Sequence, residues 1–199
     1  MDMIKIEKVK KIYKTKKENV VALDNISFVL PDKGLIFIDG VSGCGKTTLM
    51  NILSGLDKTT EGKIYIFGND MTDASDKEWD YLRNKDIGII FQDYNLLDDL
   101  SIYDNVLLSL KKIEMDCKEE EIDDVLKYVG LYEFKHRLCS ELSAGQKQRV
   151  AIARGIIKKP KIILADEATG NLDPDNTDNV LELFDKISKD KLVVIISHD

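Results

Sequence analysis

The sequence predicts an α/β fold: a core of alternating strands and helices that carries an N-terminal antiparallel β-subdomain and a helical insert. Three observations predict it. Strand-like segments alone occupy the first thirty residues, apolar runs of strand length alternate with amphipathic segments in the second half, and residues 94–140 are mostly helical in pattern. We expect residues 1–199 to form a single domain, with a helical subdomain at about residues 94–140.

The elements expected in the first half are mainly strands. The first is marked by apolar residues at near-alternate positions: Ile4, Ile6, Val9 and Ile12. The second covers residues 22–30 and ends at the turn Pro31-Asp32-Lys33-Gly34. Residues 35–38 are wholly apolar, which is typical of a strand buried on both faces. A helix is expected at residues 47–53, and further strands at residues 64–67 and 87–91.

Helical periodicity is found from residue 102 to about residue 129. Two apolar faces repeat at helical spacing, one formed by Val106, Leu107, Leu110 and Ile113 and the other by Ile122, Val125, Leu126 and Val129. Glu119, Glu120 and Glu121 open the second helix, where acidic side chains suit the positive end of the helix dipole. A helix after Gly145, a buried strand at residues 161–165, a helix at 174–188 and a strand at 192–196 complete the alternation.

Composition and charge narrow the class of protein. The chain has 29 basic and 36 acidic residues, for a formal net charge of −7, which argues against a nucleic-acid partner. This charge also opposes binding of a free nucleotide, so any phosphate site must be preorganised and assisted by a cation. The three cysteines have no spacing typical of a disulfide framework or a zinc site, and we expect reduced thiols.

Neither a signal peptide nor a membrane span is expected from the sequence. Residues 1–11 alternate apolar and basic side chains, and the longest apolar runs, at residues 35–38 and 192–196, are far too short to cross a bilayer. If the protein works at a membrane, another polypeptide segment must cross it.

The strongest chemical motif is the run Gly40-Val41-Ser42-Gly43-Cys44-Gly45-Lys46-Thr47-Thr48, between an expected strand and an expected helix. Its spacing is that of a phosphate-binding loop, GxxxxGK[ST]. Glycines let backbone N–H groups surround phosphate oxygens, and the helix N-terminus adds partial positive charge. Lys46 is placed to reach the β- and γ-phosphates, and the Thr47 hydroxyl to ligate Mg²⁺. A Gly-rich turn with an incidental lysine is the alternative, which the strand and helix on either side disfavour.

A second motif, Asp166-Glu167, follows the expected strand at residues 161–165. An acidic residue at the end of a buried strand, downstream of a phosphate-binding loop, supplies a carboxylate for Mg²⁺, here Asp166. Hydrolysis also needs a group that orients and polarises the attacking water, and Glu167 suits that role. The alternative is a solvated acidic turn.

With these motifs in place, the sequence resembles the nucleotide-binding domain of ABC transporters across almost its whole length. Leu142-Ser143-Ala144-Gly145-Gln146 resembles the LSGGQ signature of that family. Gln92 matches the Q-loop, Gly170-Asn171-Leu172-Asp173 is similar to the D-loop, and Ser197-His198-Asp199 is similar to the switch-histidine segment. Tyr13 lies where these domains place an aromatic residue that stacks on adenine. The signature and the D-loop separate this family from other P-loop NTPases.

The resemblance implies a role for each of these residues. ATP and Mg²⁺ are the implied cofactors. The catalytic residues are Glu167, His198, Gln92 and Lys46; the nucleotide contacts are Tyr13, Gly40, Ser42, Gly43, Cys44, Gly45, Lys46, Thr47, Thr48, Ser143 and Gly145; the metal ligands are Thr47, Gln92 and Asp166. Simpler interpretations stay open: Tyr13 as a strand aromatic, Gln92 as a surface amide, and His198 as a structural side chain.

The sequence departs from the family pattern in two positions. Ala144 replaces the first glycine of LSGGQ, so its methyl group is expected to crowd a phosphate contact made through Ser143 and Gly145. Ala168 stands where many relatives have proline, which removes a restriction on φ and no ligand. Relatives also continue past the switch histidine, so we expect a C-terminal end truncated after His198.

The family resemblance also implies an assembly. Two copies, as a homodimer or a paired ATPase domain, meet head to tail around two MgATP, with the signature of one copy facing the phosphate-binding loop of the other. The motor then lies in the cytoplasm, on the inner face of the cell membrane, through a transmembrane permease. Residues 91–97 and 166–173 are most similar to the macrolide-export, lipoprotein-release and peptide-resistance branch, which predicts an exporter-type system. A regulatory ABC ATPase that transmits force without transport is the alternative.

Overall fold

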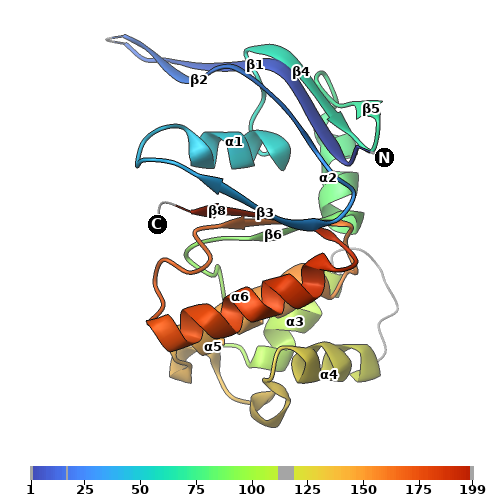
Figure 1. Cartoon of the computed structure of the whole chain (residues 1–199). Coiled ribbons are helices and arrows are strands. Elements are labelled where there is room, and N and C mark those ends of the chain that lie inside the picture. The colour runs from blue at the N-terminus through green and yellow to red at the C-terminus, as the bar shows by residue number, and fades with distance from the viewer. Residues whose placement is uncertain (1, 17, 112–118, 198–199) are drawn as a thin grey trace.

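The computed structural model describes residues 2–16, 18–111 and 119–197, and Figure 1 shows their arrangement in layers. The strands are β1 (Ile4–Lys14), β2 (Asn19–Leu30), β3 (Gly34–Asp39), β4 (Glu61–Ile66), β5 (Asn69–Asp70), β6 (Ile87–Ile90), β7 (Ile162–Asp166) and β8 (Leu192–Ser197). The helices are α1 (Lys46–Leu53), α2 (Asp76–Lys85), α3 (Ile102–Lys111), α4 (Glu119–Tyr128), α5 (Ala144–Ile156) and α6 (Pro174–Ser188), with short 3₁₀ turns η1 (Tyr132–Phe134) and η2 (Cys139–Glu141).

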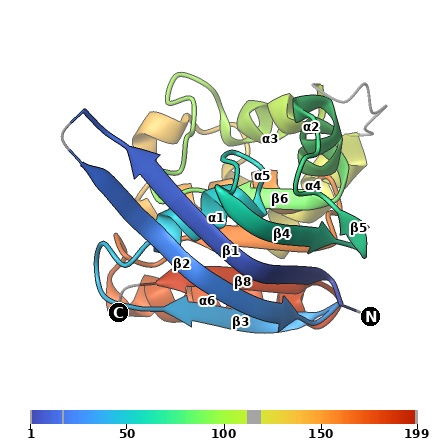
Figure 2. The same cartoon turned by 90° about the horizontal axis from the view of Figure 1, so that it is seen from above.

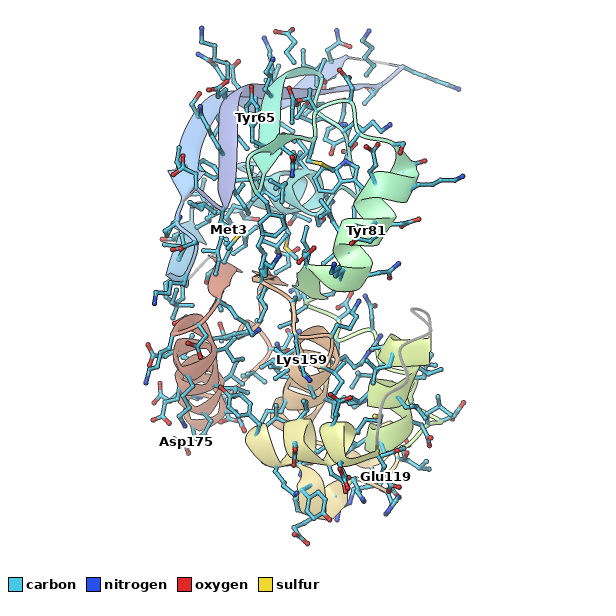
Figure 3. All side chains as sticks on the ribbon, turned by 90° about the vertical axis from the view of Figure 1, so that its right-hand side faces the viewer. Met3, Tyr65, Tyr81, Glu119, Lys159 and Asp175 are labelled. Carbon is cyan, nitrogen blue, oxygen red and sulfur yellow. The ribbon has the colours of Figure 1, made fainter. Side chains whose placement is uncertain are left out.

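The N-terminal strands form an antiparallel sheet in the order β2-β1-β4-β5, as the sequence predicts for its first part. Ile4 and Ile6 of β1 point inward and are buried, while Lys5 between them pairs with Tyr65 on the outer side. This alternation is the pattern of a sheet with one face on the core and one in solvent. Figure 2 looks onto the outer face, and Figure 3 shows the side chains that fill the space beneath it, where Met3 packs.

The second sheet is parallel, with the order β3-β8-β7-β6. Helices α1 and α2 lie on the side facing the antiparallel sheet, and α5 and α6 cover the opposite side, with α3 and α4 beyond (Figure 1). Alternate residues of β7 therefore enter different cores: Ile162 and Leu164 pack with the antiparallel sheet, and Ile163 and Ala165 pack with the helices. The strand is apolar throughout because both of its faces are buried.

The prediction for residues 35–38 is wrong in one respect. These residues do form a parallel strand, β3, but β3 is an edge strand in the described sheet, and Phe37 is 53% exposed. An edge strand has a neighbour on one side only, so less of its surface is covered. An apolar run alone does not distinguish an edge strand from a central one.

Helix α2 is not predicted from the sequence pattern. It has one buried side chain, Trp79, and therefore no apolar stripe of the kind that reveals a helix. Its start is marked instead by a capping box, in which the Ser75 side chain accepts from the Glu78 N–H and Glu78 binds the Ser75 N–H in return. Trp79 packs closely on Gly55, which has no room for a side chain.

The helices of the second half agree well with the prediction. Helix α6 begins and ends at the predicted residues, α4 opens at Glu119, and α5 begins directly before Gly145. Val106 and Leu110 of α3 pack with Ile122 and Leu126 of α4 in one buried cluster. Ile113, predicted on the same face of α3, lies outside the described residues, as does Cys117.

Candidate functional site

The carboxyl end of the parallel sheet carries a cavity of about 350 Å³. It is formed by the loop between β3 and α1, by the beginning of β2, by the end of β1, and by the residue after β7. Its lining residues are Tyr13, Val20, Val21, Ala22, Ser42, Gly43, Gly45, Lys46, Thr47, Thr48 and Glu167. The fold thus brings together residues that lie far apart in the chain, as expected where loops follow parallel strands.

Lys46 is the central cation of this cavity. The Lys46 residue is only 9% exposed. Its ammonium group donates to the carbonyl oxygen of Gly40 and, at 3.0 Å, to that of Val41. Among the described residues it has no carboxylate partner within ion-pair distance, and an ammonium has three donors. A buried charge of this kind is stable only beside groups that compensate it, and a phosphate would supply that charge.

The loop and the start of α1 leave backbone N–H groups for an anion. Gly45 occupies the N-cap position with φ of 100°, and no side chain caps the helix. A Cβ at Gly45 would approach the carbonyl oxygen of Ala22 to 2.2 Å, so both conformation and space require glycine. The first turn of α1 also lacks acidic side chains, which keeps the partial positive charge of the helix terminus available.

Asp166, at the end of β7, fits a magnesium ligand. Its Oδ1 is buried and has no hydrogen-bond partner among the described residues. Burial raises the pKa of this carboxyl, and the negative charge of Glu167 raises it further, whereas the Thr47 hydroxyl and the charge of Lys46 act in the opposite direction. An orphaned carboxylate oxygen beside a threonine hydroxyl is an oxygen donor pair that suits Mg²⁺.

Because the ionised form of Asp166 is disfavoured by its surroundings, Asp166→Asn should raise the thermal unfolding midpoint of the metal-free protein near pH 7. The raised pKa means that ionising Asp166 opposes folding at every pH above the unfolded value, which lies near 3.8. Below that pH the carboxyl is protonated in both states, so the gain should disappear. Thermal unfolding followed by circular dichroism at pH 7 and pH 3 measures this. An equal rise of the unfolding midpoint at pH 7 and pH 3, or no rise at pH 7, would contradict the raised pKa of Asp166. Asp185→Asn, on the surface of α6, is the control.

Glu167 is held in an unusual backbone conformation at the edge of the cavity. Its φ is +46°, a region that side-chain-bearing residues seldom occupy, and its N–H donates to the carbonyl of Ile196 at 2.8 Å. Strained conformations of this kind concentrate at functional sites, where the surrounding fold maintains them. The turn directs Glu167 toward the cavity, next to the carboxylate of Asp166.

Tyr13 is the aromatic residue of the cavity. It is 38% exposed and lies near the end of β1, opposite the phosphate-binding loop, where it lines the cavity with Ser42 and Thr48. Its hydroxyl donates to Asp57 at 2.7 Å. A ring that lines a polar cavity while its hydroxyl is bound elsewhere presents a π-face to whatever fills the cavity.

Gln92 and the signature residues lie outside the cavity lining. Gln92 is exposed in the turn after β6. In the described sheet β6 pairs with β7 and lies at the opposite edge from β3. Ser143 caps α5 by accepting from the Gln146 N–H, and Gly145 lies against α6, where a Cβ would approach Asn176 Oδ1 to 2.2 Å. Ala144 is exposed, so its methyl group meets no crowding within its own chain. His198 lies outside the described residues.

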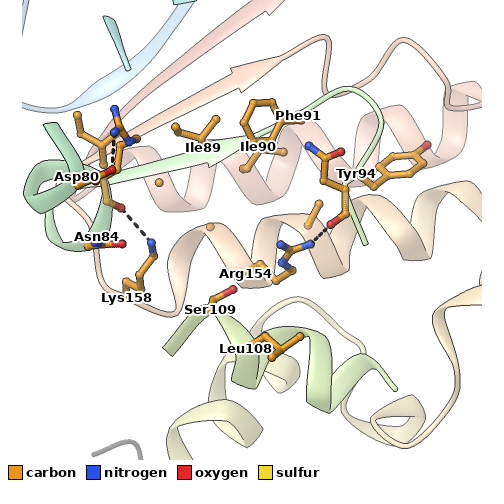
Figure 4. Close-up of a pocket in the computed structure, with 16 residues that line it drawn as sticks. Asp80, Asn84, Ile89, Ile90, Phe91, Tyr94, Leu108, Ser109, Arg154 and Lys158 are labelled. Carbon is orange, nitrogen blue, oxygen red and sulfur yellow. Dashed lines mark hydrogen bonds and ion pairs between the residues drawn. The ribbon is translucent and has the colours of Figure 1, made fainter. Parts of the chain in front are cut away.

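A second cavity, of about 340 Å³, forms a groove between α2, β6, α3 and α5 (Figure 4). Arg83 of α2 donates to Asp80 and to the carbonyl of Gly55, and Lys158 donates to the carbonyl of Arg83. Arg154 of α5 donates to the carbonyl of Asn95, which lies in the turn after Gln92. Nearby Leu97 is 53% exposed, while Leu96 packs against the core. This groove therefore combines basic and apolar side chains directly beside Gln92.

Part of the site is not predicted by any sequence motif. Residues 20–22 line the cavity, and Asp57 and Lys11 contact Tyr13, yet none belongs to a recognisable motif. Within the described ranges, no cluster of three or more His, Cys, Asp or Glu side chains is placed to hold a metal ion, so a Mg²⁺ site here needs the Thr47 hydroxyl and phosphate oxygens in addition to the Asp166 carboxylate. The part of the chain that the structure describes also contains no helix long and apolar enough to cross a membrane.

The class of protein is defined by two features: a glycine-rich loop after β3 that ends in Lys46 and Thr47, and a pair of carboxylates at the end of β7. Together they indicate a P-loop protein with an α/β core. The chain belongs to the ABC transporter family, since the model of that family matches residues 23–170. The structure resembles a dimeric post-hydrolysis state of the ATP-binding cassette MJ0796 bound to ADP and Pi, with a TM-score of 0.88, 34% identity, and coverage of 99% of this chain and 88% of that one.

Relatives of this chain serve transport in both directions. It is 37% identical over 201 residues to the methionine import ATP-binding protein MetN 1 of Staphylococcus epidermidis, covering 99% of this chain and 59% of the relative. It is 39% identical over 204 residues to the bacitracin export ATP-binding protein BceA of Halalkalibacterium halodurans, covering 100% of this chain and 80% of the relative. The chain therefore spans about three-fifths of the length of the methionine importers it matches.

Proposed function

We propose that this chain is the ATP-binding and ATP-hydrolysing motor of a bacterial ABC transporter. The observation that carries the proposal is the cavity in which Lys46, Thr47 and Glu167 meet beside Asp166. A cation for the phosphates, a metal-ligand pair and a residue that can orient water are the groups that phosphoryl transfer to water requires.

Each residue has a separate task in this proposal. The loop N–H groups, the start of α1 and Lys46 hold the phosphates, while Tyr13 stacks on the base. Thr47 and Asp166, assisted by Gln92, hold Mg²⁺, which neutralises charge that develops on the phosphates. Glu167 accepts a hydrogen bond from the attacking water and positions it in line with the bond that breaks. His198 is proposed to contact the γ-phosphate.

Two copies are needed to complete each site. Ser143 and Gly145 line no part of the cavity of their own chain, although the signature residues are implied to contact phosphate. Ser143 lies exposed at the N-terminus of α5, available to a second copy. We propose a head-to-tail homodimer in which this helix start faces the γ-phosphate held by the partner, with ATP between the two surfaces.

Mixing two inactive variants tests this arrangement. Lys46→Ala removes phosphate binding, and Ser143→Arg places a bulky cation where the partner's phosphate would lie. A mixed dimer retains one intact site, so equal amounts should recover about a quarter of parental phosphate release if copies pair at random and sites work independently. Mixing Lys46→Ala with a Lys46→Ala/Ser143→Arg chain is the control and should stay inactive. Failure of the first mixture to recover activity, with both variants folded, contradicts the shared site.

We further propose an exporter-type system coupled to a transmembrane permease at the inner face of the membrane. The permease would bind the groove of Figure 4, beside Gln92, so that the state of the nucleotide reaches it. Export is supported by the alignment with BceA, which extends over 80% of that protein. Reconstitution with the permease tests the idea: the exported compound should stimulate ATP hydrolysis. Hydrolysis without movement of any compound would favour a regulatory ATPase instead.

A further inference from the structure

Tyr13 belongs to a cluster of three side chains that joins β1 to the turn after α1. The Tyr13 hydroxyl donates to Asp57 Oδ2 at 2.7 Å, and Lys11 Nζ lies 2.5 Å from Asp57 Oδ1. Lys11 Nζ also lies over the Tyr13 ring, 4.9 Å from its centroid. We refer to Tyr13, Asp57 and Lys11 as the Tyr13 cluster.

Backbone contacts hold both sides of this cluster. The N–H groups of Leu56 and Asp57 donate to the carbonyl of Asn51, at 2.8 and 3.1 Å, so the turn folds back onto the end of α1. Lys11 donates in addition to the carbonyl of Lys58 at 2.7 Å. The Thr60 N–H binds the carbonyl of Lys10 at 2.8 Å. The carboxylate of Asp57 therefore sits at a defined distance from both β1 and the helix that follows the phosphate-binding loop.

The charge state of Asp57 sets the direction of the hydrogen bond. Burial acts to raise the pKa of this carboxyl, but hydrogen bonds from Lys11 and Tyr13 outweigh it and hold the pKa below its usual value. Asp57 is therefore ionised at neutral pH and can only accept hydrogen bonds. The Tyr13 hydroxyl must therefore donate its proton to Asp57, and that proton is not available to form a hydrogen bond with the edge of a base.

We propose that Asp57, with Lys11, is a positioning residue for nucleotide binding: it holds the Tyr13 ring in the orientation that stacks on the base. This inference rests on the proposed function, in which Tyr13 contacts the base. Lys11 occupies one face of the ring, which leaves the other for the base. Since stacking uses the π-face and the hydroxyl is committed, the site accepts adenine and guanine nucleotides alike.

Titration calorimetry with two probes separates positioning from a structural role. MgATP reports base and phosphate contacts, whereas magnesium with inorganic triphosphate reports phosphate contacts alone. Tyr13→Ala should weaken MgATP about five- to 150-fold, the range of one base–aromatic stack, and leave triphosphate unchanged. Asp57→Ala should weaken MgATP about three- to tenfold, a fraction of that stack, and also leave triphosphate unchanged. Asp57→Asn keeps an acceptor and should restore part of the loss.

A double-mutant cycle completes the test. Tyr13→Phe keeps the ring but breaks its bond to Asp57, so Tyr13→Phe/Asp57→Ala should bind MgATP no worse than Asp57→Ala alone. Asp70→Ala, which removes the exposed carboxylate paired with Lys63 on the outer face of the same sheet, is the matched control and should change nothing. In every variant, the affinity for MgGTP should change by the same factor as the affinity for MgATP.

The outcomes distinguish the two ideas. If Asp57→Ala weakens MgATP and triphosphate equally, or if the two losses add fully in the double variant, the positioning role is overturned while the proposed function stands. If the parent protein binds neither probe, the proposed function fails and the inference fails with it. Tyr13→Phe leaves Asp57 intact, so an unchanged affinity of this variant for MgATP overturns the inference even if Asp57→Ala does not fold.

Discussion

Replacing Lys46 by alanine is expected to abolish tight binding of MgATP. Lys46 lines the cavity and is buried, and its ammonium group donates to the carbonyls of Gly40 and Val41. Removing one member of a buried charge pair costs about 3–5 kcal/mol, because the other charge is left uncompensated. The global charge of −7 worsens the loss, since the net field of the chain repels an anion. Isothermal titration of MgATP measures the effect directly.

The control for this experiment is Lys33→Ala. Lys33 is exposed in the turn that precedes β3, at the opposite end of that strand from the loop, so it tests the loss of one positive charge without the loss of the site. We expect parental affinity from it. An unchanged affinity of Lys46→Ala would show that the cavity is not the phosphate site.

Replacing Glu167 by glutamine should separate binding from hydrolysis. The amide has the size of the carboxylate but cannot act as a base, so MgATP binding should persist while phosphate release falls by about 10²–10⁴-fold. Glutamine can adopt the left-handed backbone at this position as readily as glutamate, so the fold should be unaffected. With hydrolysis stopped, the ATP-bound pair of copies should accumulate and be visible by light scattering.

The exposed Glu182→Gln, on α6, is the matched control, and it should hydrolyse at the parental rate. Hydrolysis by Glu167→Gln near the parental rate under saturating Mg²⁺ would remove Glu167 from the role of base. Loss of MgATP affinity in this variant would instead indicate that the carboxylate holds the ligand. Comparison with Lys46→Ala therefore assigns one residue to binding and the other to chemistry.

Local signals were sufficient for much of the fold. Helix α6 could be bounded because Asp173 caps it, Pro174 occupies its first position, and Val180, Leu183, Phe184 and Ile187 repeat at helical spacing. The apolar run before Asp166 likewise predicts a strand buried on both faces, and β7 is buried along most of its length. Helix α2 could not be predicted, because a helix with one buried residue has no periodic apolar pattern.

The candidate site likewise has a part that could be predicted from the sequence and a part that could not. The loop from Gly40 to Thr48 and the pair Asp166-Glu167 are each continuous in sequence, so their chemistry could be inferred from residue types and spacing, and parallel strands bring their carboxyl ends to one edge. The contact between Tyr13 and Asp57 could not be inferred, because the two residues lie far apart in the chain and no motif joins them. Nor could the close approach of Gly145 to Asn176, which depends on how α5 and α6 meet.

The sequence by itself therefore determined the class of protein and, apart from helix α2, most of the order of its elements, and it supplied the residues proposed to hold phosphate and metal. The tertiary structure alone decided that β3 is an edge strand of the described sheet, that Glu167 takes a left-handed backbone, and that Asp57 binds the Tyr13 hydroxyl. The physical reason is the range of the interactions. Caps, turns and phosphate-binding loops act within a few residues, whereas strand order brings distant side chains together, and an alternating apolar pattern is compatible with many strand orders.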